Sequence, residues 1–312
     1  MSQKAIKVKH NPVQQKNWIK LNLWCWGFVS MTLIFYLLFQ GYPILCSVYY
    51  SLHNWSGMTS NMTYVGLDNY RNLMGDRLFW GAFKNSFRYM IMVVPLEVII
   101  SLFFAYLLND EKLKCRTAYR VSLFVPVVVT ASIVGIVMVF IWSSNGIVNN
   151  IMTKLGLIEK NINWLGNASY AMTTVVIVSV WKDMGTYMIY WLAALQGVPT
   201  DVLEAASVDG ATRTRTFFKV VVPIIAPTAG IILILCTINS LKAFDLIQTL
   251  TGGGPFYTTD VVATFIYRTA FTSEMGLPRF GYASAAAIVF GVVVIIIGTV
   301  LNALKGKLQQ LQ

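Results

Sequence analysis

The chain has 312 residues, of which 56% are hydrophobic and only 12% are charged, and its mean hydropathy is +0.62. An ordinary soluble domain carries about twice that charged fraction, roughly 25%, so the composition excludes that class. The net charge of +11 would suit nucleic-acid binding, and its placement along the chain decides between that function and orientation in a membrane.

Long uncharged stretches dominate the chain. A helix needs about 20 apolar residues to cross a bilayer, and the uncharged windows 21–50, 121–153, 220–241 and 280–304 all reach that length. The pattern predicts an all-α membrane protein with about six transmembrane helices. They are expected at residues 21–50, 89–108, 121–142, 170–196, 220–245 and 282–301.

Basic residues concentrate in alternate segments between these spans. With the N-terminus inside, the inner segments hold 14 Lys and Arg in 66 residues, whereas the outer segments hold 8 in 101. This bias follows the positive-inside rule and places both termini in the cytoplasm. The charge therefore orients the chain in the bilayer and does not mark a nucleic-acid site. We divide the chain into a cytoplasmic basic tail over 1–20 and a transmembrane domain over 21–312.

Catalytic patterns are missing from the sequence. It contains no GxxxxGK[ST] loop for phosphate, no HExxH zinc motif and no GxSxG nucleophile motif. The four cysteines and two histidines are scattered, which supports neither a disulfide framework nor a metal site. We therefore expect no catalytic residue, no metal ligand and no cofactor on this chain.

Polar side chains recur inside two neighbouring spans. In the fourth span four of them follow the spacing i, i+3, i+4, i+7 and share one helix face; they are Asp183, Thr186, Tyr187 and Tyr190. In the fifth span Asn239 and Ser240 form a second polar patch. Such stripes would line a route for a hydroxyl-rich solute. The alternative is interhelical hydrogen bonding that only holds the bundle together.

Glu97 stands alone in the middle of the second span, away from any cation of its own helix. Ionisable groups inside spans are functional candidates by default. We favour a structural pairing across the bundle. A proton relay is the alternative, and it would suit a secondary, ion-coupled solute carrier.

The segment 199–219 separates the fourth and fifth spans with "PTDVLEAASVDGATRTRTFFK". Pro199 and the side-chain oxygens of Thr200 and Asp201 predict a capped helix start, and Glu204 follows Asp201 at the spacing of a capping box. Gly210 predicts a left-handed end to this short helix. Three small residues would let another backbone approach closely: Ala205, Ala206 and Ala211.

The motif "EAASVDGA", followed by "FFKVVVPIIAP", resembles the EAA loop of inner-membrane permease subunits of binding-protein-dependent ABC importers. Its Asp-Gly-Ala continuation is similar to the carbohydrate branch, with the maltose, glycerol-phosphate and multiple-sugar systems. "LFVPVVVTASIVGIVMVFIWSSNGIVNNIM", "WLAALQGVP", "LTGGGPFYTTDVVATFIYRTAF" and "GYASAAAI" also stand in the family's order, so the likeness covers about 65–305. The charged pair Lys182–Asp183 departs from the family pattern.

The resemblance implies a type I ABC importer permease fold and a role for the loop 199–219. It would be the coupling element that docks into a cleft of a cytoplasmic ATPase subunit. Glu204 would engage the ATPase, Ala205 and Ala206 would fit the cleft, and Gly210 would set the turn. Asp209 and Ala211 complete this ATPase-coupling site.

The resemblance also implies partners that this chain lacks. These are a second, related permease subunit and an extracytoplasmic solute-binding protein, which would meet the outer loop at Gly252, Gly253, Gly254 and Pro255. ATP and magnesium would be bound by the ATPase. The expected function is passage of a sugar or oligosaccharide across a bacterial or archaeal cytoplasmic membrane by alternating access.

Overall fold

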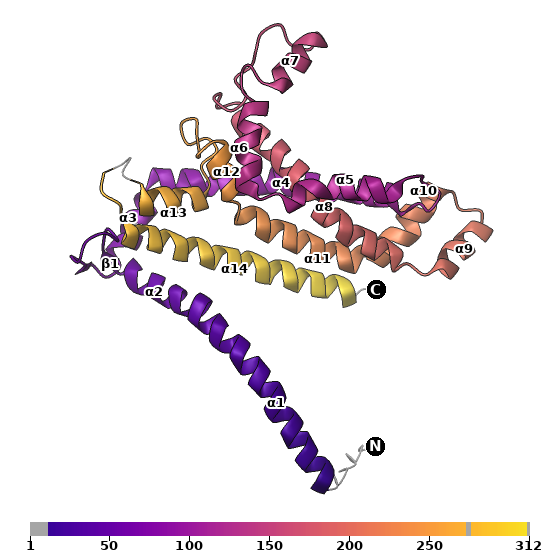
Figure 1. The fold of residues 1–312 in the computed structure, drawn as a ribbon, viewed down its shortest axis with the longest axis horizontal. Coiled ribbons are helices and arrows are strands. Elements are labelled where there is room, and N and C mark those ends of the chain that lie inside the picture. Colours follow the sequence, from indigo (N-terminus) through magenta and orange to yellow (C-terminus); the bar gives the residue numbers. More distant parts are fainter. Residues whose placement is uncertain (1–11, 273–275, 311–312) are drawn as a thin grey trace.

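A computed structural model describes residues 12–272 and 276–310 of the chain (Figure 1). The regular secondary structure of this part is helical, apart from a short antiparallel pair of strands, β1 (His53–Asn54) and β2 (Thr63–Tyr64). Inside lipid every backbone N–H and C=O must be satisfied within the protein, and a helix does this segment by segment. The predicted all-α fold is confirmed. Most of the predicted basic tail, residues 1–11, lies outside the described residues.

Four helices of the described chain are long and apolar enough to cross a membrane, and they span Lys20–Ser51, Arg77–Asn109, Arg213–Leu241 and Phe280–Gly306. The first joins α1 (Pro12–Tyr36), a π-helical turn η1 (Leu37–Gly41) and α2 (Tyr42–Ser51). The third joins α10 (Arg213–Thr216), a second π-helical turn η2 (Phe217–Val221) and α11 (Val222–Leu241). The other two are α4 (Arg77–Asn109) and α14 (Phe280–Gln310). They match the predicted first, second, fifth and sixth spans.

The predicted third and fourth spans differ from the sequence-based expectation. The third is broken into α5 (Arg116–Val128) and α6 (Ala131–Ile141), which are bent by 99° to each other, so the apolar stretch predicted as a span over 121–142 is divided between two helices. The fourth is α8 (Ala171–Gln196), which is long enough but less apolar, because Lys182 and Asp183 lie at its middle. Length and composition thus give four spans, or five with the bent pair, in the part of the chain that is described.

The core of the bundle lies where α4 packs against α8 and α11. Buried apolar side chains from these helices and from α12 (Asp245–Leu250) fill it; they include Val93, Val175, Val178, Ile232 and Ile247. In a membrane such packing stabilises by close van der Waals contact rather than by removal of apolar surface from water. The result is a rigid centre that holds the polar residues of α8 and α11 in place.

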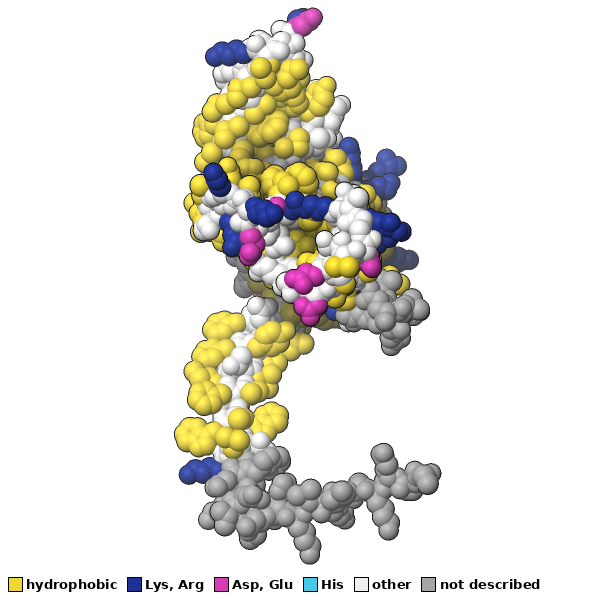
Figure 2. Space-filling view, turned by 90° about the vertical axis from the view of Figure 1, so that its right-hand side faces the viewer, with side chains coloured by type: hydrophobic (Ala, Val, Ile, Leu, Met, Phe, Trp, Pro, Cys, Tyr) yellow, Lys and Arg dark blue, Asp and Glu magenta, His cyan; other side chains and the backbone are white. Residues whose placement is uncertain are grey.

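Three of the shorter helices lie toward the two ends of the bundle: α3 (Asp68–Gly75), α9 (Thr200–Val208) and α13 (Val262–Phe271). A fourth, α7 (Ile147–Lys154), stands away from the bundle beyond α6 (Figure 1). Figure 1 shows α9 and α10 at the same end as the close of α14, and α3, β1 and α13 at the opposite end. Figure 2 views the first end face-on, with Lys and Arg side chains lying across it. This clustering fits the inner side that the positive-inside rule assigns to segments 109–120 and 197–219.

The first span stands apart from the rest of the bundle. In Figure 1 α1 leaves the other helices at an angle, and α14 packs only against the α2 part of this span. The apolar window of Lys20–Ser51 is 0% buried, and Trp24, Trp26 and Phe28 are all exposed. Its apolar surface is therefore free for lipid or for another chain.

Candidate functional site

The protruding helix α9 carries the predicted ATPase-coupling residues. It begins at Thr200 after Pro199, whose backbone is extended (φ −60°, ψ 133°), and no side chain caps its first turn. The predicted capping oxygens of Thr200 and Asp201 are therefore wrong. Asp201 instead lies in the first turn, where its negative charge interacts favourably with the helix dipole.

The end of α9 is a Schellman motif. The backbone N–H of Ala211 donates to the carbonyl of Ala206 at 3.0 Å, and that of Gly210 donates to Ser207 at 3.1 Å. This pattern needs a left-handed residue after the helix, and Gly210 has φ +72°. The predicted glycine turn is confirmed, and it redirects the chain into α10, where the Thr212 hydroxyl accepts from the N–H of Arg215.

The face of α9 that points away from the bundle is accessible along its whole length. Glu204, Ala205, Asp209 and Gly210 are exposed, while Ala206 and Ala211 are half-buried. The sequence-based reasoning missed two apolar neighbours, Val202 and Val208, which are 39% and 88% exposed. They lie three residues to either side of Ala205, so the three form an apolar strip beside Glu204. The three-residue spacing of Val202, Ala205 and Val208 could have predicted this strip from the sequence.

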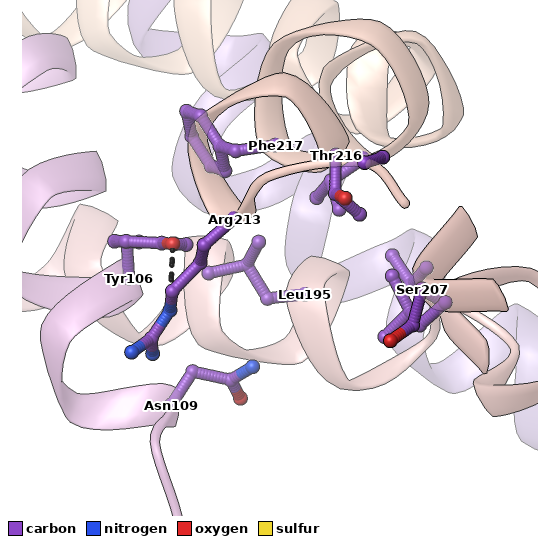
Figure 3. Close-up of a pocket in the computed structure, with 11 residues that line it drawn as sticks. Tyr106, Asn109, Leu195, Ser207, Arg213, Thr216 and Phe217 are labelled. Atoms are coloured by element: carbon purple, nitrogen blue, oxygen red, sulfur yellow. Dashed lines mark hydrogen bonds between the residues drawn. The ribbon is translucent and has the colours of Figure 1, made fainter. Parts of the chain in front are cut away.

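A cavity of about 350 Å³ lies behind α9, between it and the inner ends of α4, α8 and η2 (Figure 3). Leu195, Ser207 and Thr216 are among its lining residues, and the rings of Tyr106 and Phe217 pack 4.6 Å apart at its wall. α9 has no buried residue, and its half-buried Leu203 packs against the apolar cluster of α4, α8 and α11. Its packing on the bundle is therefore light.

Arg213 ties the end of this segment to α4. Its Nε donates to the hydroxyl of Tyr106 at 3.1 Å, and its Nη2 donates to Oδ2 of Asp110 at 2.9 Å. The backbone N–H of Lys112 and the Arg213 guanidinium hold the pKa of Asp110 below its usual range, so this pair is charged at neutral pH. The two partners are 103 residues apart, and spacing along the sequence gave no signal for them.

A second cavity, of about 170 Å³, lies among α4, α6, α8, α11 and α12. Four of the six residues predicted for the substrate pathway line it: Asp183, Tyr187, Asn239 and Ser240. Thr186 and Tyr190 are not among the lining residues; Thr186 is half-buried, and Tyr190 is 43% exposed. The structure thus brings together the two predicted stripes, but Thr186 and Tyr190 of the first one do not line the cavity.

Hydrogen bonds order the polar groups of this cavity. Lys182 Nζ, on a residue only 9% exposed, donates to Oδ1 of Asp183 at 2.8 Å. Asn239 Nδ2 donates to the Tyr187 hydroxyl at 3.3 Å, which joins α11 to α8. The cavity therefore offers donors, acceptors and an aromatic ring within one small space, the combination that recognises a polyhydroxylated molecule.

Glu97 also lines this cavity and is 3% exposed. Its Oε2 accepts a hydrogen bond from the thiol of Cys236 on α11 at 2.8 Å, which is the pairing across the bundle that we favoured from the sequence. Tyr89, which sequence reasoning missed, lines the same space and donates to Ser179 at 2.7 Å. Residues 139 positions apart thus meet through the crossing of α4 and α11.

The predicted docking residues Gly252 to Pro255 form a turn between α12 and α13, on the side of the bundle away from α9 (Figure 1). Gly253 has φ +87°, and a Cβ at this position would meet Oδ1 of Asp260 at 2.8 Å. The Thr259 hydroxyl donates to the carbonyl of Gly254. This loop is therefore an ordered turn held against the residues that follow it.

Known proteins share both the sequence and the fold of this chain. The chain is 32% identical over 90% of its length to the probable ABC transporter permease protein YurN of Bacillus subtilis (strain 168), of which it covers 94%. It is 29% identical to the multiple sugar-binding transport system permease protein MsmF of Streptococcus mutans, over 92% of this chain and 96% of that protein.

A solved structure of a bacterial alginate ABC transporter, in complex with an alginate pentasaccharide-bound periplasmic protein, has a similar fold. Its TM-score to this chain is 0.75 at 25% identity, covering 91% of this chain and 94% of the other. The family model described as "Binding-protein-dependent transport system inner membrane component" matches residues 79–310. That range includes both cavities, α9 and the outer turn, and the chain belongs to this family of inner membrane transport components.

Proposed function

We propose that this chain is the membrane-spanning permease subunit of an ATP-driven importer that carries a sugar or oligosaccharide. The observation that carries the proposal is α9, an exposed helix with a carboxylate and an apolar strip, placed at the basic end of a transport-family bundle. An element of this kind, with little packing of its own, suits a partner that moves it. The ATPase is a separate subunit, which binds the ATP and magnesium.

Alternating access connects the two cavities in this proposal. Closure of the ATPase subunits moves α9, and the movement passes through α8 and α11 to the polar cavity that they line. α8 ends just before α9 and α11 follows it, so displacement of the coupling segment acts directly on both cavity walls. Glu204 would engage the ATPase, and the small residues Ala205 and Ala206 would allow its surface to come close.

A second permease subunit would complete the solute route. The polar cavity of about 170 Å³ is formed by one chain alone, and the exposed first span leaves an apolar surface that another chain can cover. The sugar class rests on the relatives that are named for sugar transport and on the hydroxyl-binding groups of the cavity. The proposed location is the cytoplasmic membrane of a bacterium or archaeon, with a solute-binding protein on the outer side.

Asn239 gives a test of the solute route. We expect Asn239→Leu to lower the apparent solute affinity about tenfold, because a neutral hydrogen bond contributes about 1 kcal/mol and an unpaired buried group costs about 1–3 kcal/mol. Solute-stimulated ATP hydrolysis by the reconstituted complex measures this affinity. Asp183→Leu would be a poorer probe, since it leaves the buried ammonium of Lys182 without its partner.

Thr186→Val is the matched control for Asn239→Leu. It also removes a polar group from a helix that borders the cavity, but Thr186 does not line the space. Stimulation should therefore stay close to that of the unchanged complex. Equal loss in both variants, or loss in neither, would point to hydrogen bonds that only hold the helices together.

Co-purification tests the assembly directly. The chain, tagged and extracted in mild detergent, should bring with it an ATPase subunit and a second permease subunit. A secondary carrier would purify without either. Recovery of this chain alone, under conditions in which it transports, would contradict the proposed function.

A further inference from the structure

Phe256 is the most exposed large apolar side chain in the described part of the protein, with 91% of its surface accessible. It follows Pro255 in the turn between α12 and α13. A single exposed apolar residue is ordinary on a protein surface. The backbone conformation of Phe256 and the residues that clamp it make this case different.

Two consecutive aromatic residues here adopt the left-handed region of backbone conformation. Phe256 has φ +49° and Tyr257 has φ +59°, although bulky residues rarely occupy this region. Such a conformation persists only where the surrounding structure imposes it, and it gathers at functional sites. The Phe256 ring stays exposed in this conformation, so packing of the ring within the chain does not explain the left-handed backbone.

A buried ion pair imposes the conformation. Oδ2 of Asp260, which is 1% exposed, accepts from Nη2 of Arg268 at 2.7 Å, and its Oδ1 accepts from the hydroxyl of Thr264 at 2.7 Å. The Arg268 guanidinium also lies 4.4 Å from the centre of the Tyr257 ring. These contacts with Thr264 and Arg268 of α13 hold Tyr257 and Asp260 in place.

Asn85 of α4 clamps the same backbone from the side. Its Nδ2 donates to the carbonyl of Tyr257 at 2.9 Å and to that of Asp260 at 3.0 Å. The backbone of the turn is therefore held by α4 and α13 together, and it carries the solvent-exposed ring of Phe256. Rigid aromatic side chains make good anchors in protein interfaces, because little conformational freedom is lost when they are covered.

We propose that Phe256 is the anchor by which the solute-binding protein docks on this chain. The proposal rests on the proposed function and deepens its assignment of the outer turn. The turn lies away from α9, on the side opposite the basic end (Figures 1 and 2). The neighbours of Phe256, Gly252 to Pro255 and Thr258, carry no charge, so nothing beside it attracts lipid headgroups. Phe256 does not line the polar cavity either.

Photocrosslinking identifies what covers the ring. A photoreactive phenylalanine analogue is placed at position 256 of the full complex in membrane vesicles, and the purified solute-binding protein that supports wild-type uptake is added. We expect a crosslink to that protein, stronger with solute present. The same analogue at Phe218, which is 64% exposed near α9, should give none. A crosslink from position 256 to lipid or to the second permease subunit overturns the proposal.

Affinity measurements test the contribution of the ring. For Phe256→Ala we expect about a 10- to 30-fold higher half-saturating concentration of the binding protein in stimulated ATP hydrolysis, with basal hydrolysis unchanged. Leu277→Ala, at a residue that is 83% exposed, should change neither. Phe256→Gly relieves the backbone strain and should weaken docking equally while the thermal midpoint stays the same or rises. An unchanged half-saturating concentration in both Phe256 variants overturns the proposal.

Failure of the proposed function and failure of the Phe256 anchor give different results. If the wild-type complex binds no ATPase and no binding protein stimulates it, the proposed function fails. If the wild type is stimulated normally and the Phe256 variants match it, only the anchor fails.

Discussion

Glu204→Lys is expected to abolish solute uptake while the protein remains folded and inserted. Glu204 is exposed on α9, and within the described chain no hydrogen bond or ion pair holds its carboxylate, so its reversal costs little stability; such surface changes usually stay within about 0.5 kcal/mol. At a docked interface a misplaced charge costs several kcal/mol. We therefore expect a loss of about 100-fold or more in uptake.

The measurement is uptake by vesicles that contain the assembled complex, together with the amount of ATPase subunit that co-purifies. Asp201→Lys is the matched control, because it reverses an exposed charge on the same short helix, one turn away. Asp201→Lys should retain most of the uptake activity. The uptake by Glu204→Gln should lie between that of Asp201→Lys and that of Glu204→Lys. Wild-type uptake by Glu204→Lys would remove α9 from the coupling pathway.

Asp260→Ala is expected to destabilise the protein by about 3–5 kcal/mol, the usual cost of leaving a buried charge without its partner. The Arg268 side chain is 8% exposed and its Nη2 lies 2.7 Å from Oδ2 of Asp260. Without Asp260, the Thr264 hydroxyl loses one of its two acceptors and keeps the carbonyl of Val261, and the turn that carries Phe256 loses its buried ion pair.

Thermal unfolding in detergent measures this effect. Asp110→Ala is the control, because it removes the acid of an ion pair whose arginine, Arg213, has a 70% exposed side chain; exposed pairs contribute little. The double change Asp260→Ala with Arg268→Met should recover part of the lost stability, since no unpaired charge remains. A melting temperature of Asp260→Ala equal to that of the wild type would show that the pair does not hold the turn.

The sequence predicted the features that depend on local composition. Long apolar stretches located α4, α11, α14 and the first span, because length and hydropathy alone decide whether a helix can cross lipid. Gly210 predicted the end of α9, since the left-handed turn there favours glycine. Both signals lie within a few residues of the feature that they predict.

Features that depend on tertiary contact were missed. The uncharged window 121–153 runs through the 99° bend after Val128, so the absence of charge could not separate α5 from α6. After the bend α6 packs against α12, a tertiary contact that the sequence does not show. The helix start at Thr200 was predicted, but the capping oxygens of Thr200 and Asp201 were wrong, because Pro199 takes the N-cap position and no side chain caps the first turn. The partners of Glu97 and Arg213 lie more than 100 residues away.

The decisive measurement is whether solute transport through this chain depends on ATP or on an ion gradient. Vesicles containing the purified complex are loaded with ATP and given the binding protein and a radiolabelled sugar that stimulates hydrolysis, with all ion gradients collapsed by an uncoupler. We expect accumulation that requires internal ATP and is lost with a non-hydrolysable analogue. Accumulation without ATP, driven by an imposed proton or sodium gradient and abolished by the uncoupler, would contradict it.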